Sequence, residues 1–178
     1  MLEILQYCYE KIDFIDEKVE IGFECPLDLH CNYSRDQLLV AMDYMKPSSM
    51  QTGVKYFQDK GIDLFLVTLN KAQKDYSPTT MYNDYSVSEE LFHWQSQNMT
   101  SPESPTGQRY IGHSGTKNKI MLFVREYKTD ASGTSPYTYL GLVDYVSHTG
   151  SKPMNILWRL RRPIPARFIS KTNKLVAG

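Results

Sequence analysis

Two neighbouring stretches bring together side chains that could bind a planar polar ligand. The first is Tyr82–Ser88 and the second is Leu91–Gln97. Aromatic rings can stack on a nucleic-acid base, at about 1–3 kcal/mol per base, and amides or carboxylates can hydrogen-bond to its edge. Taken alone, the pattern favours a structural interpretation, in which Phe92 and Trp94 are core residues and the polar residues form caps and turns.

A base pocket can nevertheless be assembled from these stretches. Tyr82, Tyr85 or Trp94 would enclose a flipped base, and Asp84 would accept a hydrogen bond from its exocyclic amine. Gln95 or Gln97 would complete the contacts to the base edge. The full set of base-binding candidates is Tyr82, Asp84, Tyr85, Ser88, Trp94, Gln95, Ser96 and Gln97.

A protein that reads an atom on a stacked base has to remove that base from the duplex, and contacts to phosphates can offset the cost. Each cation taken singly is more typical of an ordinary surface residue, and Arg125, at the end of an apolar strand, could be partly buried and paired. The candidates for phosphate binding are Arg109, Lys117, Lys119, Arg125, Lys152, Arg159, Arg161 and Arg162.

The sequence offers no positive support for catalysis. It contains no Walker lysine loop, no G-x-G-x-x-G, no H-E-x-x-H and no G-x-S-x-G, and its four histidines are scattered. Cys25, His30 and Cys31 lie close together, but no C-x-x-C pair accompanies them, so a zinc site is not expected. We therefore expect a binding module rather than an enzyme, with no metal and no cofactor.

Charge is unevenly distributed in this chain of 178 residues, which has a net charge of zero. Residues 1–30 carry eight acidic and two basic side chains, whereas residues 150–178 carry seven basic and no acidic ones. A basic end can bind anions, but it can equally be a solvated tail or the complement of the acidic end. No apolar run approaches transmembrane length, and residues 1–20 are too charged for a signal peptide, so we expect a cytoplasmic location and no membrane partner.

The elements that would position these residues are mostly strands. The pattern predicts helices over residues 1–18 and from Ser34, where Ser34 and Gln37 form a capping box, to Pro47. It predicts strands at 54–57, 62–69, 109–111, 119–127, 137–146 and 154–160, with a hairpin turn at 59–61. The fold class is therefore α+β, with N-terminal helices and a mainly antiparallel, barrel-like sheet over about 52–162. Residues 1–32 are an N-terminal helix and linker, 33–165 the main domain, and 166–178 a basic tail.

Several short motifs resemble a known family over residues 33–165. They are Tyr82-x-Asp84-Tyr85-x-x-Ser88, Phe92–Gln97, Arg109–Ile111, Leu122–Arg125, Tyr139–Gly141, Gly150–Met154 and Trp158–Leu160. The family is the poorly characterised domain at the C-terminus of bacterial superfamily II helicases, often fused to a phospholipase D-type nuclease. These fusions include ATP-dependent type IV restriction enzymes that cut DNA containing methylated or hydroxymethylated cytosine.

The resemblance implies that the chain is the target-recognition part of a larger enzyme, whose helicase and nuclease domains are its partners. Residues 1–32 would then dock on the helicase. The ligand would be double-stranded DNA with 5-methylcytosine or 5-hydroxymethylcytosine, held in a barrel of the SRA or PUA type by analogy.

Other functions remain open at this point. The domain could bind DNA that is unmodified or carries phosphorothioate, for which an apolar patch near Pro163–Pro165 is a candidate. It could be a protein-interaction or regulatory domain of a helicase, with its aromatic rings in the core, or it could contain an unrecognised nuclease centre. For the modified-cytosine reader, the sequence predicts that Trp94→Ala removes the preference for modified DNA and that Arg161→Ala weakens binding to all duplexes alike.

Overall fold

The computed structural model describes residues 21–50, 52–70, 84–131, 133–165 and 168–169. The predicted helix over 1–18 and most of the predicted tail over 166–178 lie outside these residues. The elements are β1 (Asn32–Tyr33), α2 (Arg35–Ala41), η1 (Pro47–Ser49), β2 (Val54–Phe57), β3 (Ile62–Asn70), β4 (Tyr85–Ser86), β5 (Leu91–Gln95), α3 (Pro105–Gly112), η3 (His113–Gly115), β6 (Lys119–Tyr127), β7 (Thr129–Asp130), β8 (Gly133–Thr134), β9 (Tyr137–Thr149) and β10 (Asn155–Leu160).

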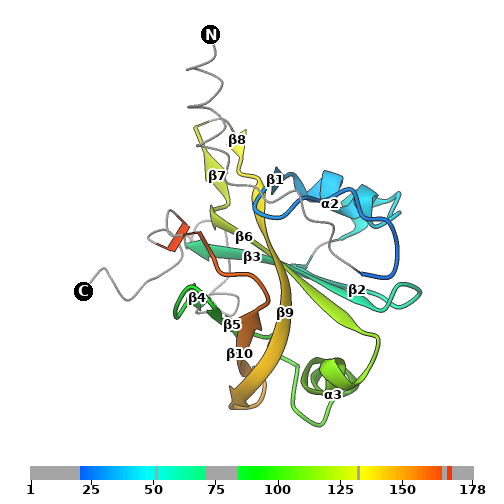
Figure 1. The fold of residues 1–178 in the computed structure, drawn as a ribbon, viewed down its shortest axis with the longest axis vertical. Helices are drawn as coiled ribbons and strands as arrows, with labels where there is room; N and C mark the ends of the chain where they lie inside the picture. The colour runs from blue at the N-terminus through cyan, green and yellow to red at the C-terminus, as the bar shows by residue number, and fades with distance from the viewer. Residues whose placement is uncertain (1–20, 51, 71–83, 132, 166–167, 170–178) are drawn as a thin grey trace.

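The main sheet is open and mixed (Figure 1). Its strand order is β2-β3-β6-β9-β10-β5-β4, with β1 also paired to β9, while β7 and β8 form a separate two-stranded sheet. β3 and β6 are parallel, and the other neighbouring strands are antiparallel. No pairing within the described residues joins the edge strands β2 and β4. The expected barrel is therefore not formed, and a side-chain period of two could not have revealed this, because it does not specify which strands pair.

Most of the predicted strands are present. The hairpin of β2 and β3 turns at residues 58–61, as the pattern predicted, and Gly61 adopts a φ of 63° there. β9 runs three residues beyond its predicted end, to Thr149. β3 and β6 are parallel because the chain between them first forms β4, β5 and α3, and a parallel pair needs such a long crossover.

The sheet separates two hydrophobic cores. Along β3, Leu64 and Leu66 belong to one core, and Phe65 and Val67 belong to the other. This alternation follows from the pleat, which directs successive side chains to opposite faces of a sheet. Both faces of β3 are covered, so the strand reads as a continuous apolar run rather than as an alternating one.

Helix α2 covers the first core. The predicted capping box is confirmed: the Ser34 hydroxyl accepts from the Gln37 amide, and the Gln37 side chain accepts from the Ser34 amide. The helix buries Leu38 and Leu39 and ends at Ala41, several residues before Pro47.

Helix α3 replaces a predicted strand. The sequence predicted Arg109–Ile111 as a strand, but these residues lie inside α3. The Ser104 hydroxyl caps the helix by accepting from the Gly107 amide, and Pro105 occupies the first turn, where its missing N–H costs nothing. A Cβ at Gly107 would lie 2.0 Å from the Ser101 carbonyl oxygen, so only glycine fits against that loop. A three-residue apolar run could not distinguish helix from strand.

A buried ion pair fastens α3 to the sheet. Asp63 of β3 is fully buried, and its carboxylate accepts from Arg109 Nε at 2.8 Å and Nη2 at 2.9 Å. Asn118 donates a third hydrogen bond to Asp63 at 2.9 Å, and the Arg109 guanidinium lies 3.9 Å from the centre of the Tyr56 ring. The carboxylate is thus hydrogen-bonded to a planar cation and to an amide, as a buried charge requires.

We predict that Asp63→Ala destabilises the domain by about 3 kcal/mol, because it leaves Arg109 and Asn118 without their shared acceptor. Urea unfolding measures the change. The matched control is Asp43→Asn, which removes an exposed ion pair with Lys60, keeps a residue type that tolerates the φ of 59° at this position, and should change stability by less than about 1 kcal/mol. Equal losses in the two variants would contradict a structural role for the Asp63 pair.

Candidate nucleic-acid interface

Strand β5 divides the predicted base-binding residues between the core and the solvent. Phe92 and Trp94 point into the second core, whereas Leu91, His93 and Gln95 are half-exposed on the opposite side. Strand β10 also alternates between core and solvent. Ile156 and Trp158 are buried, whereas Leu157 between them is half-exposed. This part of the sheet therefore has one core face and one face toward solvent.

Cross-strand register defines the solvent-facing residues. Gln95, Asn155 and Thr149 are direct neighbours, as are His93, Leu157 and Ser147 in the next row. Residues opposite one another in paired strands share a face. We call this surface the open face; all its members are half-buried or exposed, and they are Tyr85, Leu91, His93, Gln95, Asp144, Ser147, Thr149, Asn155, Leu157 and Arg159.

The open face carries an aromatic pair and an amide pair. The rings of Tyr85 and His93 are stacked, with centroids 4.8 Å apart and an angle of 18° between their planes. In the neighbouring row, Gln95 Nε2 donates to Asn155 Oδ1 at 3.2 Å. Rings can stack on bases and amides can hydrogen-bond to base edges, so both groups are suited to contact nucleic acid.

Charge on the open face is partly neutralised. Arg161 binds the Asp144 carboxylate through Nε at 2.9 Å and Nη2 at 2.8 Å, and this hydrogen bonding lowers the pKa of Asp144 below its usual value. Arg159, directly opposite Asp144 on β10, is exposed and has no ion pair among the described residues. Arg159 is therefore the cation of this face that is most available to a phosphate.

Trp94 does not lie on the open face. Its ring is 4% exposed and stacks on Phe65, with centroids 4.2 Å apart, and it forms an edge-to-face pair with Tyr110 and a tilted pair with Trp158. This burial weighs against stacking of Trp94 on DNA. Trp94→Ala would instead create a core cavity, with a cost of about 3–5 kcal/mol.

The other predicted base-binding residues have mainly structural contacts. Asp84 is buried, and its Oδ1 accepts from the Gln95 amide at 2.9 Å. The Ser96 hydroxyl accepts from the Met154 amide, and the Ser88 hydroxyl accepts from the amides of the following turn. Gln97 is half-exposed at the end of β5, and Tyr82 lies outside the described residues. Of the eight candidates, the structure places Tyr85 and Gln95 together on the open face.

The predicted phosphate-binding residues do not form one rim. Arg109 is bound to Asp63, and Arg125 donates to the Thr68 hydroxyl and the Ser135 carbonyl oxygen beside the Tyr137 ring. Lys117 precedes β6 and Lys119 begins it. Lys152 lies in the turn before β10, Arg159 lies within β10, and Arg161 and Arg162 follow its last residue. The two cations nearest the open face are Arg159 and Arg161.

Sequence reasoning missed two residues of the open face that could contact a ligand. His93 lies inside the singled-out stretch but received no role, and Asn155 received none either. The alternation Asn155, Leu157, Arg159 within the predicted strand 154–160 was the signal that could have identified Asn155 as a partner of Arg159 on one face.

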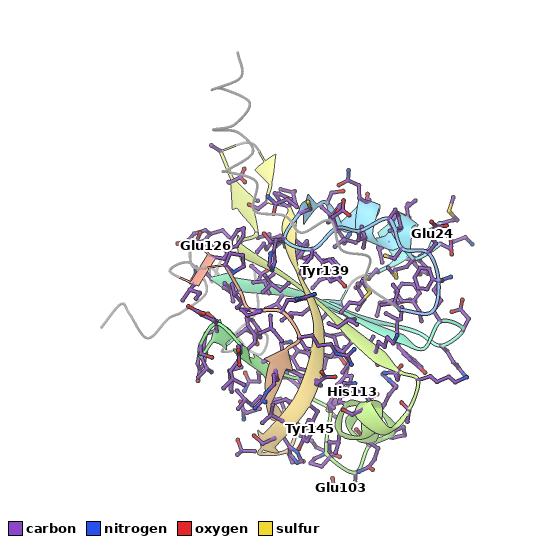
Figure 2. All side chains as sticks on the ribbon, viewed as in Figure 1. Glu24, Glu103, His113, Glu126, Tyr139 and Tyr145 are labelled. Atoms are coloured by element: carbon purple, nitrogen blue, oxygen red, sulfur yellow. The ribbon has the colours of Figure 1, made fainter. Side chains whose placement is uncertain are left out.

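His113 supports strand β9 from the core side. Its ring is buried, and Nε2 accepts from the Tyr145 amide at 2.9 Å (Figure 2). Burial lowers the pKa of His113, although the Asp144 carboxylate opposes the shift. The neutral ring is the form that can accept this hydrogen bond. Tyr145 adjoins the irregular register between β9 and β10, so His113 supplies an acceptor where the regular ladder is interrupted.

The comparisons with known proteins place the chain in a family without assigning it a function. The model of the family described as a domain of unknown function (DUF3427) matches residues 27–171. The chain belongs to this family. No curated protein matches it significantly.

One solved structure that is similar to this DUF3427 chain is the DNA recognition domain of the cytosine modification-dependent restriction endonuclease LpnPI. The TM-score is 0.34 and the sequence identity 11%, over 62% of this chain and 59% of that one. At such a TM-score the likeness carries no conclusion about function.

Two further observations concern the described residues alone. None of their helices is long and apolar enough to cross a membrane. The same residues contain no group of three or more histidine, cysteine, aspartate or glutamate side chains arranged to hold a metal ion, and Cys25 and Cys31 are free thiols.

We predict that the domain loses stability as the pH falls below about 6.5, the usual pKa of histidine. Burial lowers the pKa values of His113 and His30 in the folded state. Between the folded and unfolded pKa values, the unfolded chain binds more protons and is favoured, whereas above both values no such linkage operates. The Asp144 carboxyl, with its lowered pKa, contributes only at much lower pH.

Urea unfolding at pH 7.5 and pH 5.5 measures this effect. His113→Gln keeps an acceptor for the Tyr145 amide but cannot titrate, so its stability should depend less on pH than that of the original chain. An unchanged pH dependence in His113→Gln would exclude His113 as a source of the effect.

Proposed function

We propose that this domain is a DNA-recognition module that binds duplex DNA containing a modified cytosine, through the open face. The observation that carries the proposal is the composition of that face. Stacked Tyr85 and His93 rings, the Gln95–Asn155 amide pair and the exposed Arg159 lie in successive rows of one solvent-facing sheet. The resemblance noted in the sequence supplies the class of ligand.

Each part of the face has a physical role in this proposal. The Tyr85–His93 pair offers a flat ring surface for an extruded base, and a stacked pair is already ordered, so little side-chain entropy is lost on binding. The amide pair contacts the edge of a base pair that flanks the extruded base. Arg159 contacts a backbone phosphate, which positions the duplex and adds a salt-dependent, sequence-independent contribution.

In this proposal, DNA binding and catalysis belong to different domains. The module binds and does not cut, and ATP hydrolysis and strand cleavage belong to helicase and nuclease domains in the same or a partner chain.

A protein-interaction domain is the second candidate, and the burial of Trp94 favours it. Leu91 and Leu157 are half-exposed on the open face and could pack against a protein surface. The half-exposed Tyr85 and the exposed Arg159 are compatible with both candidates, because tyrosine and arginine are enriched at protein interfaces as well as suited to DNA contacts.

We predict that the domain binds a duplex with 5-methylcytosine more tightly than the same unmodified duplex, measured by fluorescence anisotropy at near-physiological salt. Arg159→Ala should weaken binding of both duplexes alike and reduce the slope of log K against log salt by about one, because one phosphate contact is lost. The matched control is Arg35→Ala, which removes an arginine of α2 already paired with Asp36 and away from the open face.

The outcomes separate the candidate functions. Equal affinities for the two duplexes would indicate an unmodified-DNA binder. Binding of neither duplex would overturn the DNA-recognition proposal in favour of the protein-interaction domain. Equal effects of Arg159→Ala and Arg35→Ala would show that the open face is not the DNA-contacting surface.

A further inference from the structure

We infer that Asn155 is a base-reading residue and that Gln95 determines which polar atom of Asn155 faces the DNA. This inference rests on the proposed function and deepens it. It assigns to the open face a hydrogen-bond donor that recognises an acceptor on the edge of a base. The juxtaposition that carries it is the Gln95–Asn155 amide pair, one residue from β5 and one from β10.

The contact with Gln95 orients the Asn155 amide. Gln95 Nε2 donates to Asn155 Oδ1 at 3.2 Å, so the carbonyl end of Asn155 points toward β5. Asn155 Nδ2 is bonded to the same carbon as Oδ1, and its two N–H donors point in a different direction from the carbonyl oxygen. Asn155 Nδ2 therefore points away from Gln95 and lies beside the exposed Gly150, where an added Cβ would be 3.3 Å from it, and Asn155 as a whole is half-buried.

The backbone of Gln95 is hydrogen-bonded to a buried residue on the core side of β5. Its backbone N–H donates to Asp84 Oδ1 at 2.9 Å, and Asp84 is 1% exposed. Asp84 thus acts as a positioning residue that fixes the end of β5 beneath the face, rather than as a direct contact to a base. The buried Asp84 therefore fixes the backbone of Gln95, and the Gln95 side chain in turn orients the Asn155 amide.

The donor has a clear class of ligand. An amide N–H₂ complements acceptors on base edges, such as guanine O6 and N7, adenine N7 and thymine O4 in the major groove. Arg159 lies four residues further along β10 on the same face, at about 13 Å for a strand rise of about 3.3 Å per residue. One strand can therefore place a base contact and a phosphate contact on one DNA segment.

Two different substitutions each replace the outward-facing donor of the amide pair with an acceptor. Asn155→Asp keeps an acceptor for Gln95 Nε2 but replaces the outward donor with an acceptor. Gln95→Glu leaves Asn155 in place but turns its amide, because Asn155 Nδ2 would then donate to the new carboxylate and Oδ1 would face outward. A purely structural pair would not give the same change of base preference in both variants.

The experiment measures which bases are selected. A pool of duplexes with one 5-methylcytosine and randomised flanking pairs is bound, recovered and sequenced. We expect Asn155→Asp and Gln95→Glu both to lose the original selection by tenfold or more at one position, and to favour bases that present a donor there. Gln58→Glu, in the exposed β2–β3 turn, makes the same amide-to-acid change and should select as the original chain does.

The readout distinguishes the inference from electrostatic and folding effects. An added negative charge weakens binding to all sequences alike, so it lowers affinity without changing the selected bases. If both variants select the same bases as the original chain, the inference is overturned while the proposed function stands. If the original chain shows no preference for DNA with 5-methylcytosine and no flanking selection, both are overturned.

Discussion

The buried pair of Asp63 and Arg109 is the interaction on which the rest of the structure depends. Asp63 is fully buried in β3, and Arg109 belongs to α3, so the pair fixes the helix against the second core. Tyr110, the next residue, then packs edge-on against Phe65, Trp94 and Trp158. By covering these rings, α3 makes one side of β5 and β10 a core surface, and the opposite side of the same strands is the open face.

The neutralised cations show why a count of basic residues says little about where an anion binds. Arg109 is bound to the buried Asp63 carboxylate and Arg161 to the Asp144 carboxylate. Each partner neutralises part of the positive charge of its arginine. Arg125 is held by the Thr68 hydroxyl and the Ser135 carbonyl oxygen. Arg159, on β10, is exposed and has no ion pair among the described residues.

Pattern-based prediction succeeded where structure is local. The strands at 54–57, 62–69 and 119–127, the turn between the first two and the capping box at Ser34 depend on side-chain alternation and turn chemistry within a few residues. It failed for Arg109–Ile111, where a short apolar run fits helix and strand equally and the Ser104 cap and Gly107 contact decide for a helix. It also missed the parallel pairing of β3 with β6, which joins segments more than fifty residues apart.

The sequence by itself determined several candidates for base contact, five of the ten strands in the described residues and the family, because residue chemistry and short-range periodicity depend on the residues along the chain. It predicted no strand over 91–95, and it placed Trp94 and Gln95 in one base pocket, whereas the structure puts them on opposite sides of β5. Only the tertiary structure decided which of those sides is covered, and hence that Trp94 is core while Gln95 meets Asn155 on the open face. The physical reason is that burial and cross-strand neighbours depend on the packing of α3 and the register of β10, neither of which is encoded near residue 94.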